Sequence, residues 1–247
     1  MSINPVGGLG YVLKGLRLIT RPGLRRFVII PLLINIVVFG IGLWLAYDQL
    51  GGLSAWLQGY LPSWLDWLTT LMLPLFMLVA LVVIFFGFSI IANLIASPFN
   101  GLLAEKVEEL LTGKPLPDSG WGKMAAELPG TLRDEVNKLL YSLVWAIPFL
   151  LLFVIPVVNI AAPFLWLAFS AWIMAVQYAD YPMGNHGLKG REMRRRLGRR
   201  RITSLSFGGG VLALTSIPVV NFIAMPVAVC GATAYWVGKL SEQDDRG

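Results

Sequence analysis

The chain has 247 residues, of which 56% are apolar and only 14% are charged, and its formal net charge is +6. Soluble domains carry about 25% charged residues, and one core of this length cannot bury so much apolar surface. The composition therefore excludes an ordinary soluble domain, and it also excludes a disordered chain. Nine Trp and seven Tyr suit the interfacial belts of a membrane protein.

Two residue types that often carry chemistry are nearly missing. Cys230 is the only cysteine and His186 the only histidine, so an intramolecular disulfide, a thiolate cluster and a histidine metal site are excluded. His186 lies in a glycine-rich turn, where we expect a structural hydrogen-bonding role. We therefore predict no metal, no cofactor and no enzyme activity.

The charged residues follow a block pattern along the chain. Four blocks contain no charged residue: 27–47, 68–104, 139–179 and 202–238. The N-terminal segment 1–26 carries a net charge of +5, and the segment 180–201 carries +6. The excess positive charge is thus confined to two segments that flank apolar blocks.

The first two blocks fit simple membrane-spanning helices. The segments 27–47 and 68–95 each reach the roughly 20 apolar residues that cross a bilayer. Residues 48–67 between them contain no Lys or Arg and carry a net charge of −2. The positive-inside rule then places this connection outside and both termini in the cytoplasm. A buried hairpin of a soluble protein is the alternative.

Two segments have the apolar spacing of amphipathic helices. Residues 9–19 place five apolar side chains on one face, and residues 101–112 repeat the pattern opposite three glutamates. Such helices suit the membrane interface. Further along, Thr131-Leu-Arg-Asp134 resembles a capping box, which predicts a helix start. We expect 101–138 to be a cytoplasmic helical segment.

The third and fourth blocks share a short repeat. Ile-Pro-Val-Val-Asn occurs at 155–159 and again at 217–221, and another proline follows each copy. Because a helix usually ends just before proline, the repeat predicts helical hairpins over 139–179 and 202–238, each broken at Pro-Val-Val-Asn. Asn159 and Asn221 are good N-caps for the helix after each break, and Pro163 suits the first turn of the next helix.

The lengths of the hairpin arms favour partial insertion. The arms before the breaks, 143–155 and 205–217, have about 13 residues and reach about 20 Å, whereas the hydrocarbon core is about 30 Å thick. We predict an all-α integral membrane protein, one domain over 1–247. It has two long transmembrane helices, two hairpins that insert only partly, and interfacial amphipathic helices. Structural kinks in full spans are the alternative.

The connection over 180–201 contains a strongly basic run, with seven arginines between Arg191 and Arg201. Such a run could bind nucleic acid, but it lies between two membrane hairpins. We therefore expect it to contact anionic lipid headgroups and to fix the topology in the membrane. We do not expect it to bind nucleic acid.

The residues before the first spanning block have the composition of an anion site. Thr20 or a neighbour can cap the helix, Pro22 suits its first turn, and Gly23 lets a ligand approach the backbone. Free N–H groups and the positive end of the helix then face the same place as Arg25 and Arg26, which suits a tetrahedral oxyanion. The alternative is that these arginines only anchor the helix at the headgroups.

The sequence resembles the CysZ family of bacterial sulfate permeases over nearly its whole length. The residues that carry the likeness are Gly23-Leu-Arg-Arg26, the two Pro-Val-Val-Asn hairpins, and Asp180-Tyr-Pro-Met-Gly-Asn-His-Gly187 with the basic run after it. The resemblance implies an oligomeric protein of the bacterial inner membrane that admits sulfate for cysteine biosynthesis. It also implies that sulfate binds at Gly23, Leu24 and Arg25, with Arg26 adjacent.

We therefore expect a sulfate channel or ion-coupled permease that does not hydrolyse ATP, since no Gly-x-x-x-x-Gly-Lys-Ser/Thr signature occurs. Arg25 and Arg26 would recognise sulfate at the cytoplasmic mouth. The helix N-termini at Asn159 and Asn221 would stabilise it deeper in the membrane. Glu105 is a further candidate at the mouth, although a solvated helix face explains it as well. A non-transporting membrane scaffold is the alternative function.

Overall fold

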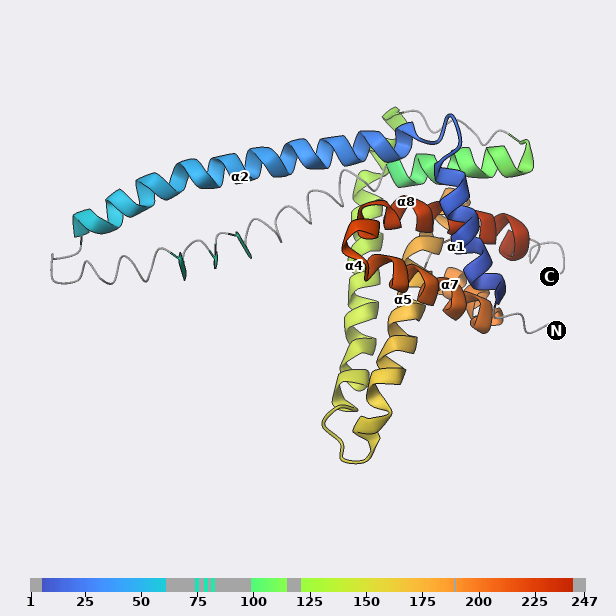
Figure 1. The fold of residues 1–247 in the computed structure, drawn as a ribbon. Helices are drawn as coiled ribbons and strands as arrows, with labels where there is room; N and C mark the ends of the chain where they lie inside the picture. Colours follow the sequence, from blue (N-terminus) through green and yellow to red (C-terminus); the bar gives the residue numbers. More distant parts are fainter. Residues whose placement is uncertain are drawn as a thin grey trace. The chain divides into compact units, whose positions relative to one another are not determined.

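The computed structural model describes residues 6–60, 74–75, 78–79, 81–82, 99–114, 121–188 and 190–241. Every regular element in these ranges is helical, and no strand occurs among them. The elements in chain order are α1 (Val6–Ile19), α2 (Arg26–Tyr60), an unlabelled helix over 99–112, α4 (Trp121–Leu151), η2 (Val158–Ile160), α5 (Ala162–Asn185), α6 (Gly190–Arg199), α7 (Arg201–Thr215), α8 (Pro218–Tyr235) and η3 (Trp236–Leu240) (Figure 1). The all-α class is confirmed for these ranges.

Three helical segments in the described ranges are long and apolar enough to cross a membrane. They are Arg26–Leu45 in α2, Ala162–Asn185 in α5, and Val220–Leu240, which joins α8 to η3. A shorter apolar segment, Val136–Leu151, forms the second half of α4. The predicted second span, 68–95, lies outside the described residues apart from three helical pairs.

The chain forms two compact units, and the smaller one, over 29–97, contains most of α2. This helix runs for 35 residues with Pro31 inside it, which is about 52 Å at 1.5 Å per residue. The sequence predicts that the first span ends at Tyr47 and that 48–67 forms a connection. This is wrong for residues 48–60, which continue α2. Gly51 and Gly52 each cost only about 1 kcal/mol in a helix, and the helix continues past them.

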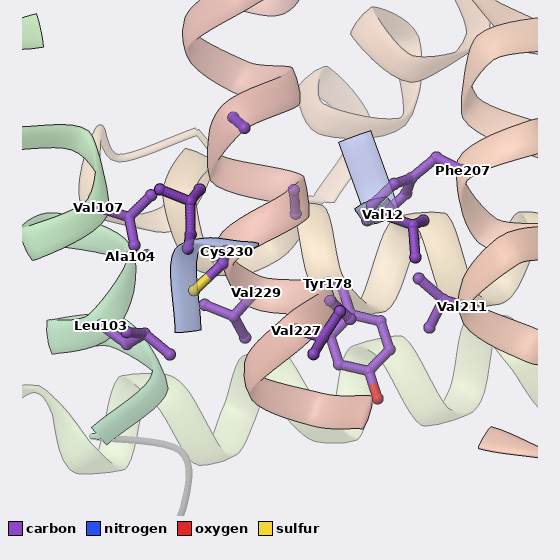
Figure 2. Close-up of a cluster of buried hydrophobic side chains, with 14 of the residues drawn as sticks. Val12, Leu103, Ala104, Val107, Tyr178, Phe207, Val211, Val227, Val229 and Cys230 are labelled. Atoms are coloured by element: carbon purple, nitrogen blue, oxygen red, sulfur yellow. The ribbon is translucent and has the colours of Figure 1, made fainter. Parts of the chain in front are cut away.

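The larger unit, over 1–28 and 98–247, is a helical bundle around one main core. Its buried side chains come from α1, the helix over 99–112, α5, α7 and α8. Figure 2 labels ten of them: Val12, Leu103, Ala104, Val107, Tyr178, Phe207, Val211, Val227, Val229 and Cys230. A second cluster, which includes Met183, Met193 and Leu197, joins α5, α6 and η3. These clusters place the basic helix α6 against the apolar ones.

Glycines allow the helices of this bundle to approach one another closely. A side-chain carbon at Gly15 of α1 would overlap the backbone of Val227 in α8. One at Gly208 of α7 would overlap the backbone of Ala171 in α5. Small residues at helix crossings are typical of helices that pack inside membranes. The glycines therefore determine which face of α1 and of α7 enters the bundle.

Both predicted amphipathic helices exist, but they form part of the bundle core. α1 buries Val12 and leaves Leu9 and Leu13 exposed, and the helix over 99–112 buries Val107. The prediction that their apolar faces lie in the membrane interface is therefore wrong for the buried positions. On α1, neighbouring helices cover the buried apolar side chains, because the glycine contacts bring α7 and α8 against this helix.

The cytoplasmic helical segment is divided at a different place from the one predicted. The helix over 99–112 ends at Gly113, whose φ of 70° and N–H to the Glu109 carbonyl (2.8 Å) form a glycine C-cap. α4 begins at Trp121, so the predicted helix start at Thr131 is wrong. The upstream residues Met124-Ala-Ala-Glu-Leu are strong helix formers, and the helix runs through the capping pattern.

The two copies of Ile-Pro-Val-Val-Asn adopt different conformations. The first lies in the irregular connection between α4 and α5, where Val157 has a φ of 69°, and it ends in η2. The second copy starts a helix, because Pro218 is the first residue of α8. Proline is pre-organised for that position. The same five residues therefore form part of an irregular connection in one place and begin a long helix in the other.

The predicted N-cap roles of Asn159 and Asn221 are wrong. α5 follows Ala161, α8 follows Ile217, and neither helix has a side-chain cap. The backbone N–H groups of Asn159 and Asn221 donate to the carbonyls four residues earlier, at 3.0 Å and 2.8 Å. Both residues therefore already belong to turns of helix. Pro163 does lie in the first turn of α5, as predicted.

Candidate functional site

The residues predicted to bind an anion form the turn between α1 and α2. Thr20 Oγ1 donates to the Arg17 carbonyl at 2.9 Å, so Thr20 stabilises the end of α1 and does not cap α2. α2 begins at Arg26, so Pro22 lies in the turn and outside the first turn of the helix. Both predicted capping details are therefore wrong, although the turn itself lies where the sequence predicts it. We call residues 20–26 the anion turn.

Gly23 and Leu24 determine the shape of the anion turn. Gly23 has a φ of 90°, a conformation that costs little only for glycine. A side-chain carbon there would meet no atom within 4 Å, so the requirement is conformational and not one of close packing. Leu24 is 4% exposed and belongs to the main core. The turn is thus anchored by its leucine and open at its glycine.

Arg25 and Arg26 are exposed on the anion turn. The Arg25 Nε donates to the Thr20 carbonyl at 2.7 Å, which orients the guanidinium against the turn. The Arg26 Cζ lies 5.0 Å from the ring centroid of Phe27, within cation–π range. Neither arginine has a carboxylate partner among the described residues. Two positive charges therefore meet at the start of α2, whose dipole favours an anion.

The three candidate pathway residues lie on other elements. Glu105 is partly buried on the helix over 99–112, whose Leu103 lies in the same core as Leu24. Asn159 lies in η2 and Asn221 in the first turn of α8, and both are exposed. Neither asparagine side chain hydrogen-bonds to another described residue. The structure thus links the helix of Glu105 to the anion turn through a shared core, to which neither asparagine contributes a buried side chain.

A buried asparagine that the sequence did not indicate joins three elements of the bundle. Asn100 is 4% exposed, and its Nδ2 lies 3.0 Å from the Met225 Sδ and 3.4 Å from the Tyr181 Oη. These contacts connect the helix over 99–112 to α8 and α5. No local pattern could have identified this role, because its partners lie 81 and 125 residues away in the sequence.

His186 takes part in a second polar cluster at the end of α5. Its Nε2 lies 2.9 Å from the Glu108 Oε1, and the Trp236 Nε1 donates to the same oxygen at 3.4 Å. The other Glu108 oxygen, Oε2, is buried and has no hydrogen-bond partner among the described residues. The prediction of a structural hydrogen-bonding role for His186 is confirmed.

A largely buried ion pair connects α4 to α5. The Lys138 Nζ lies 2.8 Å from the Asp180 Oδ2, and their side chains are 9% and 22% exposed. Asp180 begins the segment that carries part of the family resemblance, so the structure gives this residue a role in packing. Within the described ranges, no group of three or more His, Cys, Asp or Glu side chains is arranged to hold a metal.

Comparison with known proteins bears on the whole of this arrangement. A protein-family model described as "Sulfate transporter CysZ/Etoposide-induced protein 2.4" matches residues 11–226. The chain belongs to this family. The matched segment includes the anion turn, both Pro-Val-Val-Asn copies and the basic run, so the resemblance predicted from those residues is confirmed.

Two curated relatives in the family carry the name "Sulfate transporter CysZ". The protein from Pectobacterium atrosepticum is 48% identical over 233 residues, which cover 94% of this chain and 85% of the relative. The protein from Vibrio atlanticus is 45% identical over 243 residues, covering 97% of this chain and 95% of the relative. The similarity therefore extends over both units of the structure.

Proposed function

We propose that this protein transports sulfate across the bacterial inner membrane, supplying cysteine biosynthesis, as a channel or ion-coupled permease without ATP hydrolysis. The observation that carries the proposal is the anion turn. It presents two exposed arginines and a left-handed glycine on a base held by a buried leucine. Relatives that are nearly half identical over nearly the full length are named sulfate transporters.

The chemistry of sulfate fits an exposed turn better than a closed pocket. Sulfate is doubly negative at neutral pH, so lipid cannot be its path, and a conducting protein must replace part of its hydration without holding it tightly. Arg25 offers its terminal guanidinium nitrogens while its Nε is bonded to the Thr20 carbonyl. Arg26 adds a second charge at the start of α2. Gly23, Leu24, Arg25 and Arg26 are the proposed sulfate-binding residues.

The exposed apolar surface of the α4–α5 pair supports its insertion into the bilayer. The two helices lie side by side (Figure 1), and Leu143, Val144 and Phe164 are 60–72% exposed. The apolar part of α4, Val136–Leu151, is about 24 Å long, short of the roughly 30 Å hydrocarbon core. α5 is long enough to cross, but its second half buries Ala175, Tyr178 and Met183 in the bundle. We place this pair part-way into the membrane from the cytoplasmic side, with both termini in the cytoplasm and 48–67 outside.

We expect Asn159 and Asn221 to line the pathway through their side chains. An exposed amide on an apolar surface is costly in lipid, and Asn221 is followed by Phe222, which is 71% exposed. Each amide therefore needs water, the substrate or a partner subunit. Asn221→Leu should lower labelled-sulfate uptake at least several-fold in cells that lack other sulfate uptake. Phe222→Leu is the matched control, and equal uptake by the two variants at equal expression would contradict the role of Asn221.

The main test is sulfate flux into liposomes that contain the purified protein. The double variant Arg25→Ala with Arg26→Ala should bind sulfate more weakly by about 100-fold or more, because charge-assisted hydrogen bonds contribute about 1.5–3 kcal/mol each and two are lost. Calorimetry measures this binding, and flux should fall with it. Arg17→Ala, also exposed but at the end of α1, is the control and should leave both unchanged.

The same assay separates the parts of the proposal. If the wild-type protein gives no sulfate flux, the proposed transport is wrong. If the wild type conducts and the double variant conducts equally well, the arginines only anchor the helix. Flux that requires a pH gradient would indicate proton coupling, and flux without one would indicate a channel.

A further inference from the structure

A hollow lies between the α4–α5 pair and the basic helices α6 and α7, away from the anion turn in sequence. Its volume is about 800 Å³, and residues of all four helices line it. The lining combines two kinds of side chain: one wall is aromatic, and the rim is formed by arginines. Neither the family description nor the proposed transport assigns a role to it.

The aromatic wall runs along the membrane-facing pair. Tyr141, Trp145 and Phe149 are four residues apart on α4, so they share one face of the helix, and they extend about 12 Å along its axis. On α5, Phe169 stacks on Phe149 with ring centroids 4.7 Å apart. The Trp172 Nε1 donates to the Tyr141 Oη at 3.1 Å. The wall is therefore ordered, and it continues toward the apolar end of the pair.

The basic rim lies at the other end of the hollow. Arg194, Arg195, Arg199 and Arg201 line it, and the Arg194 Cζ lies 4.3 Å above the ring of Tyr141. Arg195 has Glu192 at 3.6 Å, in an exposed pair. The other three have no carboxylate partner among the described residues. The rim therefore keeps a positive charge, and it meets the wall at the tyrosine farthest from the turn that joins α4 to α5.

This distribution favours one class of ligand. A free inorganic anion would use the arginines but has no use for an aromatic wall about 12 Å long. An apolar molecule would use the wall but not the arginines. A phosphodiester headgroup with an acyl chain matches both, and basic pockets between membrane helices on the cytoplasmic side are known sites for such headgroups.

We propose that this hollow binds an anionic phospholipid, with its phosphate on the Arg194–Arg201 rim and one acyl chain along Tyr141, Trp145 and Phe149. The bound lipid would join the α4–α5 pair to α6 and α7 at the membrane surface. The proposal depends on insertion of this pair into the bilayer and not on sulfate transport, so the two can fail separately.

Native mass spectrometry of the full-length protein with added lipid tests the proposal. Phosphatidylglycerol should be retained, and phosphatidylethanolamine with the same chains should not. Arg194→Gln with Arg199→Gln should lower phosphatidylglycerol retention about tenfold or more. The control Arg191→Gln removes a charge from the same helix outside the hollow and should leave retention within about twofold. Equal retention of the two lipids, or equal loss in both variants, would overturn the proposal.

A cross-linking measurement on the wild-type protein distinguishes a bound phospholipid from a free inorganic anion in the hollow. Phosphatidylglycerol with a photoreactive acyl chain should label the peptides that contain Trp145 and Phe149, and excess sulfate or phosphate should not abolish this labelling. Labelling of other peptides would show that the acyl chain does not lie in the hollow, and complete displacement by the inorganic ion would show a simple anion site. Protein–protein cross-links in place of lipid adducts would show that a second copy covers the hollow. Each of these results contradicts a lipid site.

Discussion

The substitution Gly208→Ala is expected to lower the free energy of unfolding by about 3 kcal/mol or more, or to prevent folding. Inserting a methylene into a tight interior typically costs about 1–3 kcal/mol, and here the obstacle is backbone. The new carbon would overlap the carbonyl of Ala171 and approach the Ala175 nitrogen to 3.0 Å. α5 and α7 would have to move apart. Unfolding of the purified protein in detergent micelles, followed by circular dichroism, measures the change.

The neighbouring glycine provides the control. At Gly209 the same carbon would meet only the Ala171 Cβ at 3.9 Å, an ordinary contact. Because alanine is favoured over glycine in a helix by about 1 kcal/mol, Gly209→Ala should leave stability unchanged or raise it. If both variants were equally stable, α5 and α7 would not be in the close contact that the structure shows.

Lys138→Ala should destabilise the protein by about 3 kcal/mol, because removing one partner of a buried ion pair leaves the other charge without compensation. The pair joins α4 to α5 at 2.8 Å, and the Asp180 side chain is only 22% exposed. That residual exposure places the expected cost at the low end of the roughly 3–5 kcal/mol range. Chemical unfolding in micelles measures it.

An exposed pair of the same kind provides the comparison. The Lys106 Nζ lies 2.7 Å from the Glu109 Oε2, with side chains 43% and 40% exposed. Pairs of this kind contribute about 0–1 kcal/mol, so Lys106→Ala should change stability by less than about 1 kcal/mol. Removing both partners, with Lys138→Met and Asp180→Leu, should recover much of the loss. Similar effects of the two lysine variants would show that the 138–180 pair is not buried in the folded protein.

The structure distinguishes helices with a largely exposed apolar surface from those that form the interior. α8 is buried among α1, α5 and α7, whereas the apolar side chains of the second half of α4 and of the first turns of α5 are largely exposed. The sequence treats 139–179 and 202–238 alike, as charge-free blocks with the same Pro-Val-Val-Asn. The difference arises because glycines such as Gly15 and Gly231 let α1 pack on α8, and the buried side of α4 has no comparable glycine contact among the described residues.

Local signals in the sequence determined the class, the family and the anion turn. Charge-free blocks identify membrane helices because burying a charge in hydrocarbon is costly, and a glycine between Pro22 and Leu24 marks a turn because left-handed φ favours it. Tertiary structure decided the rest. Asn100 meets Met225, Glu108 meets His186, and Lys138 meets Asp180 only after helices far apart in sequence have packed. Capping patterns at Asn159 and Asn221 failed because helix starts depend on proline placement and packing as well as on local propensity.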